Sequence, residues 1–117
     1  MTPAPVKAPV PHTVLASLDV RVGEIVAAVA VAKSEKLVKL TVDFGDHTRQ
    51  ILAGLKKERP DLSEIVGKQA LFVVNLEPRK MAGEVSEGML FDLGYADGLL
   101  PCFAVPETPV PNGTRAG

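Results

Sequence analysis

The sequence of 117 residues has no tryptophan, one tyrosine, one cysteine and two histidines. A single cysteine, Cys102, excludes a disulfide within the chain and a zinc site built from several thiolates. His12 and His47 lie far apart in the sequence, so no metal site is expected. An isolated thiol favours a reducing compartment, and we expect Cys102 to be a buried structural residue.

Signs of catalysis are equally scarce. There is no Walker-type phosphate loop and no glycine fingerprint for a dinucleotide, so no cofactor is expected. A nucleophile needs a base held beside it, but His12 lies in a proline-rich segment and His47 lies beside a turn. Glu84 and Glu87 form a carboxylate pair in a loop that shows no pocket pattern. We therefore predict a non-catalytic binding module and not an enzyme.

The sequence also lacks a long apolar run and an excess of one charge. No run approaches the ~18–20 residues that cross a bilayer, and the N-terminus has no apolar signal core, so we predict a cytoplasmic protein without a membrane partner. Lys and Arg number 13 against 14 Asp and Glu, which excludes binding to nucleic acid through bulk positive charge. The charges are nevertheless uneven, with a net +3 over residues 1–60 and −4 over residues 61–117.

What the sequence does contain is the pattern of one small domain, to which its length is suited. Prolines recur within residues 1–13, at Pro3, Pro5, Pro9 and Pro11. Proline fixes φ and removes backbone donors, so we expect a disordered tail there, either a partner-binding polyproline segment or a plain linker. The folded domain is expected over residues 14–117.

Short strands are indicated by β-branched residues and by alternation with a period of two. The predicted strands cover residues 18–27, 37–44, 50–53, 69–75, 88–93 and 99–105. Alternation places Val38, Leu40, Val42 and Phe44 on one face, and the apolar run 70–74 favours a strand buried on both faces.

Two features interrupt the strands. Gly23 favours a bulge or a sharp bend within the first strand. A short helix is predicted after Asp61, which resembles an N-cap with Glu64 three residues on, and Gly67 is a natural stop. Residues 76–87 are expected to form a polar loop.

A short helix between the third and fourth strands is the order of an OB-fold, an all-β five-stranded Greek-key barrel, here with an extra short C-terminal strand. An SH3-like barrel is the alternative that the helix disfavours. In an OB-fold, two loops flank the nucleic-acid groove. Lys33, Lys36 and Lys39 lie at the first of these loops, and Arg79 and Lys80 lie at the second. These cations are compatible with a phosphate-binding surface and equally with solvated loop lysines.

Four segments in order resemble the tRNA-binding domain family, namely 18–25, 42–45, 49–55 and 75–90, the last reading NLEPRKMAGEVSEGML. Residues 110–115 are also similar to its synthetase branch. That family includes the C-terminal domain of bacterial methionyl-tRNA synthetase, free-standing bacterial tRNA-binding proteins and CsaA-type chaperones. The resemblance covers residues 15–117.

The resemblance implies a homodimeric OB-fold that binds tRNA through its shape and backbone, either free-standing or auxiliary to an aminoacyl-tRNA synthetase. By position, it assigns an RNA-facing role to Lys33, Lys36, Asn75, Arg79, Lys80, Met81 and Ser86. The cations would neutralise phosphates, and Asn75 and Ser86 would donate to phosphate or ribose oxygens. The alternatives are a CsaA-type export chaperone that binds unfolded polypeptide and an inert dimerisation module.

Departures from the family pattern lower the expected RNA affinity. Ala82 stands where many relatives carry a basic residue, and Glu84 and Glu87 add negative charge to the same loop. The small number of exposed aromatic side chains also limits the expected mode of RNA binding. We expect Phe44, Phe72, Phe91 and Phe103 in the core and Tyr95 alone exposed, so stacking of bases along a single strand is not expected. The apolar segment 99–105 is a candidate dimer surface.

Overall fold

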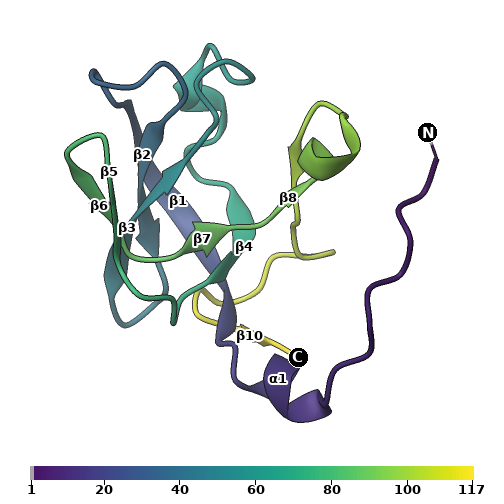
Figure 1. The fold of residues 1–117 in the computed structure, drawn as a ribbon. Coiled ribbons are helices and arrows are strands. Elements are labelled where there is room, and N and C mark those ends of the chain that lie inside the picture. Colours follow the sequence, from purple (N-terminus) through teal and green to yellow (C-terminus); the bar gives the residue numbers. More distant parts are fainter. Residues whose placement is uncertain (1) are drawn as a thin grey trace.

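Antiparallel strands curl into a nearly closed barrel in the computed structural model, which describes residues 2–117 (Figure 1). The main sheet has the order β3-β2-β1-β4-β7, with β10 paired to β1. The all-β OB-fold predicted from the element order is confirmed. The elements in chain order are α1 (His12–Ala16), β1 (Val20–Ala30), β2 (Val38–Asp43), β3 (Thr48–Ala53), η1 (Leu62–Glu64), β4 (Gln69–Val73), β5 (Arg79–Met81), β6 (Glu84–Ser86), β7 (Met89–Leu90), β8 (Asp92–Leu93), η2 (Tyr95–Asp97), β9 (Cys102–Phe103) and β10 (Arg115–Ala116).

The long strand β1 organises the barrel because it pairs with β4 along its first half and with β2 from Glu24 onward. The register with β2 shifts between Ile25 and Ala27, so the predicted bulge exists but lies beyond Gly23. Gly23 has a packing role instead. A Cβ on Gly23 would lie 2.5 Å from Cγ1 of Val42, so only a glycine allows the two strands to pack this closely.

The barrel interior holds the apolar face of β2, as the alternation predicted. Val38, Leu40 and Val42 are fully buried, and Phe44 meets the edge of the Phe72 ring with 5.6 Å between centroids. Aromatic pairs in this edge-to-face geometry stabilise a core beyond their area.

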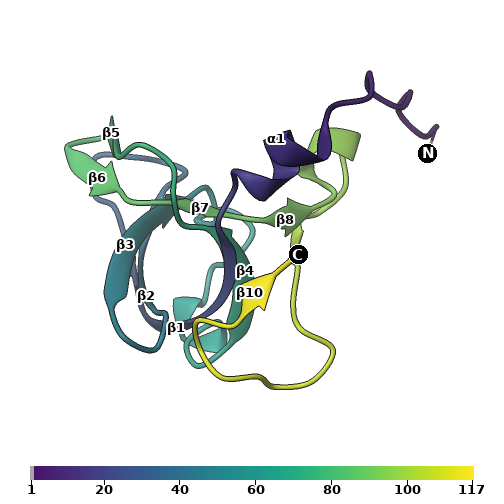
Figure 2. The ribbon, with the colours of Figure 1, turned by 90° about the horizontal axis from the view of Figure 1, so that it is seen from below.

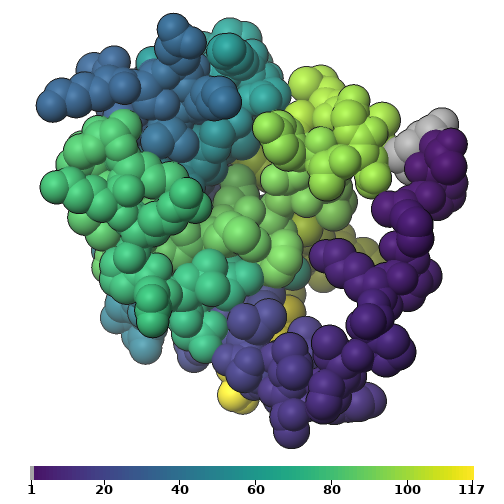
Figure 3. All heavy atoms as spheres, viewed as in Figure 1, coloured from purple at the N-terminus to yellow at the C-terminus, as the bar shows by residue number. Residues whose placement is uncertain are grey.

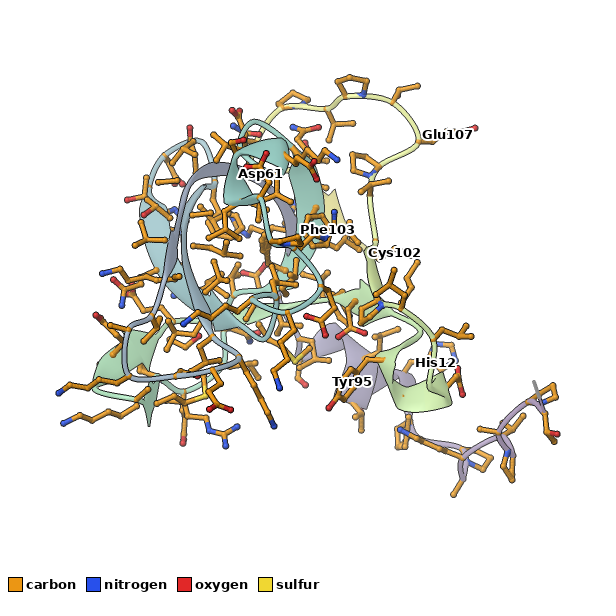
Figure 4. All side chains as sticks on the ribbon, turned by 90° about the horizontal axis from the view of Figure 1, so that it is seen from above. His12, Asp61, Tyr95, Cys102, Phe103 and Glu107 are labelled. Atoms are coloured by element: carbon orange, nitrogen blue, oxygen red, sulfur yellow. The ribbon has the colours of Figure 1, made fainter. Side chains whose placement is uncertain are left out.

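Two predictions about the C-terminal part are wrong. Phe91 is only partly buried, and Cys102 is exposed while the neighbouring Phe103 is buried (Figure 4). Neighbouring residues of a strand face opposite sides, so Phe103 in the core turns Cys102 outward.

Helical structure in the chain is short. The 3-10 helix η1 is capped by Asp61, whose side chain accepts a hydrogen bond from the Ser63 amide, which confirms the predicted N-cap. Residues 2–11 contain no helix or strand and are exposed. Helix α1 starts at His12 and therefore crosses the expected boundary between residues 13 and 14, and none of its residues is buried.

The C-terminal segment runs along the outside of the barrel beside β1 as a strap, seen in yellow in Figure 2. We define the strap as residues 110–114. Gln69 fixes its start through hydrogen bonds in both directions with the backbone of Val110. Asn112 donates to Glu24 over 3.1 Å, and the Gly113 amide donates to the carbonyl of Val22 over 2.7 Å. The chain then ends as β10 beside β1.

Candidate functional site

Residues 76–87, expected as a loop, contain a β-hairpin that projects from the barrel. Strands β5 and β6 pair Arg79 with Ser86 and Met81 with Glu84. The two-residue turn between them has φ of 51° at Ala82 and 82° at Gly83. Positive φ at both central residues is typical of the type I′ turn, whose twist matches that of the paired strands.

The hairpin is fixed to the free edge of β3 through side-chain oxygens. The Leu52 amide donates to Oγ of Ser86 over 3.0 Å, and the Gln50 amide donates to Oε1 of Glu87 over 3.0 Å. In return, the Glu87 amide donates to the Gln50 carbonyl over 2.8 Å. Hydroxyl and carboxylate oxygens therefore act where the carbonyls of a neighbouring strand would act, and they close the barrel between β3 and β7. We call Ser86 and Glu87 the clasp.

This geometry gives Ser86 a structural role. Its side chain is 3 % exposed, and its hydroxyl accepts from Leu52 while donating to the carbonyl of Gly88 over 3.0 Å. Both hydrogen-bonding functions of the hydroxyl are used inside the chain. The structure therefore places Ser86, one of the predicted RNA-facing residues, in a buried position where its hydroxyl is engaged within the chain.

Replacing Ser86 by alanine should lower the free energy of unfolding by about 1–3 kcal/mol, because the buried Leu52 amide loses its acceptor. Urea unfolding followed by circular dichroism measures this change. The matched control is Glu87→Gln, which keeps an acceptor oxygen toward Gln50 and should lose less. Equal stability of Ser86→Ala and the wild-type chain would contradict the clasp.

Asn75 also holds the chain together. Its Oδ1 accepts from the Asp19 amide over 2.7 Å, and its Nδ2 donates to the Ser17 carbonyl over 2.8 Å. The side chain thereby joins the end of β4 to the junction between α1 and β1. Like Ser86, Asn75 has its hydrogen-bonding groups engaged by backbone.

Some of the exposed cations lie at or near the hairpin. Arg79 and Lys80 are exposed on β5, whereas Met81 is half-buried beside the turn. A groove of about 240 Å³ separates the hairpin tip from the β1–β2 loop, and Lys33 and Lys39 line it opposite the tip. Figure 3 shows the hairpin in green and this loop in blue next to each other on one face.

A carboxylate lies among these cations. Glu84 accepts from Nζ of Lys39 over 3.5 Å and from the side chain of Gln50 over 3.3 Å. Glu84 thus offsets part of the charge of Lys39 and leaves Lys33, Arg79 and Lys80 as the exposed cations around the tip. Lys36, expected beside Lys33, instead lines a different groove.

Several cations within residues 1–60 stabilise the fold through hydrogen bonds and an ion pair. The net charge of this part of the chain does not show that role. Nζ of Lys56 donates to the carbonyls of Val31 and Ser34 over 3.2 and 2.7 Å and so fixes the β1–β2 loop. Arg21 binds both carboxylate oxygens of Asp19 over 2.8 and 3.1 Å. The hydrogen bond from Arg21 is the main cause that holds the pKa of Asp19 below its ordinary value.

Two kinds of site are not found in the described part of the chain. Residues 2–117 contain no group of three or more His, Cys, Asp or Glu residues placed to hold a metal ion. Within the same residues, no helix has the length and apolar character that crossing a membrane requires.

Comparison with known proteins connects this geometry to a family. The family model described as "Putative tRNA binding domain" matches residues 20–115. The methionine–tRNA ligase of Chlorobium chlorochromatii is 49 % identical over 83 residues, which are 71 % of this chain and 12 % of that protein. The chain thus spans only a small part of the curated relatives it matches.

Solved structures agree in fold over nearly the whole chain. A protein from Pyrococcus horikoshii that is related to methionyl-tRNA synthetase has a TM-score of 0.86 and 32 % identity, covering 95 % of this chain and all of the other. The chaperone CsaA from Bacillus anthracis has a TM-score of 0.81 and 27 % identity, covering 94 % of this chain and all of the other.

Proposed function

The chain belongs to the tRNA-binding domain family, and from this premise we propose that it binds tRNA through the phosphate backbone, with the β5–β6 hairpin as the main contact. The observation that carries the proposal is that the polar and charged side chains of residues 75–90 have two different roles. Ser86 and Glu87 fix the hairpin to β3, and Asn75 fixes the end of β4 that leads into it, while Arg79 and Lys80 stay exposed on the projecting hairpin. Because the backbone that carries these cations is already fixed, contact with phosphates costs only the ordering of the two side chains.

We propose that the protein acts as a binding module in the cytoplasm, either free-standing or auxiliary to an aminoacyl-tRNA synthetase. Its relatives among the methionine–tRNA ligases are much longer, since the match covers 12 % of the one from Chlorobium chlorochromatii, and we propose that catalysis lies outside the matched part. A module of this kind raises the local concentration of tRNA and leaves aminoacylation to a partner.

We further propose that the working form is a homodimer. Large apolar side chains are exposed on α1 and on the segment after η2, including Leu15 at 67 % and Leu100 at 78 %. Both elements stand out from the same flank of the barrel in Figures 1 and 2. Exposed apolar surface of this kind is typical of an interface. Light scattering should give twice the chain mass of 12.4 kDa, and a monomer at micromolar concentrations would contradict the proposal.

The second candidate function is chaperone binding of unfolded polypeptide, which the CsaA structure and the exposed apolar flank favour. The two functions differ in their dependence on salt. Contact with about three to five phosphates gives a log–log slope of binding against salt near −2 to −4, because each phosphate contributes ~0.7–0.9. Binding to an apolar peptide lacks this slope.

The test is a titration of the full chain with total tRNA and, in parallel, with a reduced unfolded polypeptide, each over a series of salt concentrations. We expect tRNA binding with the slope given above. Binding of the polypeptide alone, or tRNA binding that salt does not weaken, would overturn the proposed function.

A further inference from the structure

The groove that Lys36 lines is distinct from the groove at the hairpin tip. It opens between η2 and the end of β3 and has a volume of about 450 Å³. Figure 3 shows this face hollowed between the lime η2 segment and the blue-teal part of the chain. Leu52, Leu55 and Leu90 form an apolar floor and are 6, 5 and 7 % exposed. This size and lining are typical of a small-molecule site.

An aromatic ring stands at the rim of the groove. Tyr95 is the only tyrosine of the chain, is 69 % exposed and projects from η2 (Figure 4). Gly94 and Gly98 flank η2 with φ of 106° and 73°, so the turn that carries the ring needs glycine at both ends. An exposed ring beside an apolar floor is a surface on which a nucleobase stacks.

Charges of both signs surround the floor. Lys36 and Lys57 are exposed cations at the rim, and Glu58 and Asp92 supply carboxylates. Lysines bind phosphate, and carboxylates accept hydrogen bonds from the N–H groups of bases. An apolar polypeptide segment would use neither set, so the combination favours a nucleotide.

One of the carboxylates that line the groove has an oxygen without a hydrogen-bond partner. Within residues 2–117, Oε2 of Glu58 is the buried side-chain atom that has no hydrogen-bond partner. A buried acceptor without a donor is destabilising, so rotation of the Glu58 side chain toward a ligand in the groove that brings a donor is favoured. Guanine presents two neighbouring N–H groups on its Watson–Crick edge, which match the two oxygens of one carboxylate.

We propose that this groove binds one unpaired nucleotide of the RNA, with guanosine preferred over uridine. The base stacks on Tyr95 with its edge toward Glu58, and its phosphate lies between Lys36 and Lys57. The inference rests on the proposed function and extends it. In the proposed function the hairpin contacts the phosphate backbone of the RNA, whereas this groove would distinguish one base from another. One base on one ring needs only Tyr95. It is therefore compatible with the small number of exposed aromatic side chains, which argues against the stacking of successive bases along a single strand.

The first test titrates the full chain with 5′-GMP and 5′-UMP by NMR. The Tyr95 ring signals are unambiguous because the chain has one tyrosine. GMP should shift these signals and the amides of Lys57 and Glu58 at several-fold lower concentration than UMP. Glu58→Gln keeps the side-chain volume but replaces one acceptor with a donor, so it should abolish the preference for GMP.

The second test measures tRNA affinity. Tyr95→Ala should weaken tRNA binding about tenfold, whereas Tyr95→Phe keeps the stacking ring and should bind as the wild type does. Equal shifts with GMP, UMP and inorganic phosphate would overturn base recognition. Shifts that follow protein concentration instead of nucleotide would show that a second copy covers the groove, and would also overturn it.

The outcomes separate this inference from the proposed function. If the wild-type chain binds tRNA and Tyr95→Ala binds equally well, the groove inference fails and the role of the hairpin stands. If the wild-type chain does not bind tRNA, the proposed function fails, and the GMP titration alone decides whether the groove accepts a nucleotide.

Discussion

Replacing Arg79 and Lys80 together by alanine should weaken tRNA binding about tenfold or more at ~0.1 M salt and reduce the magnitude of the log–log salt slope by ~1.4–1.8. Both side chains are exposed on β5, which the clasp holds against β3. Each cation that leaves a phosphate also leaves a condensed counterion in place, and the slope counts such contacts. A titration of the double variant over a salt series measures both quantities.

The matched control removes two other exposed cations, through Lys68→Ala together with Arg115→Ala. Lys68 lines a groove beside Val105, and Arg115 lies on β10, so neither belongs to the hairpin. Both double variants change the net charge equally. If the control weakens binding as much as the hairpin variant does, the attraction comes from overall charge, and the hairpin loses its role.

Replacing Gly113 by alanine should lower the free energy of unfolding by about 3 kcal/mol or more. Gly113 has φ of 92°, and a Cβ there would lie only 2.2 Å from the carbonyl oxygen of Phe44. Because backbone meets backbone at this contact, no side chain can rotate away. The strap would have to move, and the hydrogen bond from the Gly113 amide to Val22 would be lost. Urea unfolding of the variant measures the effect.

Gly67 provides a control of nearly identical backbone conformation. Its φ is 91°, but nothing lies within 4 Å of the position that a Cβ would occupy. Gly67→Ala should therefore cost only the ~1–2 kcal/mol of a left-handed alanine. The difference between the two variants isolates the contact between the strap and the barrel. Equal losses would show that the strap contributes nothing to stability at this point.

The sequence predicted the barrel because its strands depend on local patterns. The alternation along β2 corresponds to a face that is fully buried at Val38, Leu40 and Val42. The cap at Asp61 is similarly local, because its side chain bonds to Ser63 two residues on. Such features depend on few residues that are close in the chain, and they can be read without knowledge of tertiary contacts.

The parts that the sequence could not predict depend on contacts across long separations. Ser86 reads as an exposed loop serine until Leu52, 34 residues away, places its amide beside the hydroxyl. The sequence does not predict the hairpin because Ala82 occupies a turn position with positive φ at which Asn, Asp or Gly is usual. Among the predicted site residues, Lys33 lines the groove at the hairpin tip, and Lys36 lines the groove beside Tyr95.

The clasp also has a consequence for aggregation of the folded chain. A strand edge with free amides is a template on which another chain can add its own strand, and this leads to aggregation. In this chain the exposed edge of β3 is short of free donors, because Gln50 and Leu52 already donate to Glu87 and Ser86. The same two side chains that fix the hairpin therefore also occupy amides of β3 with which the strand of another chain could pair.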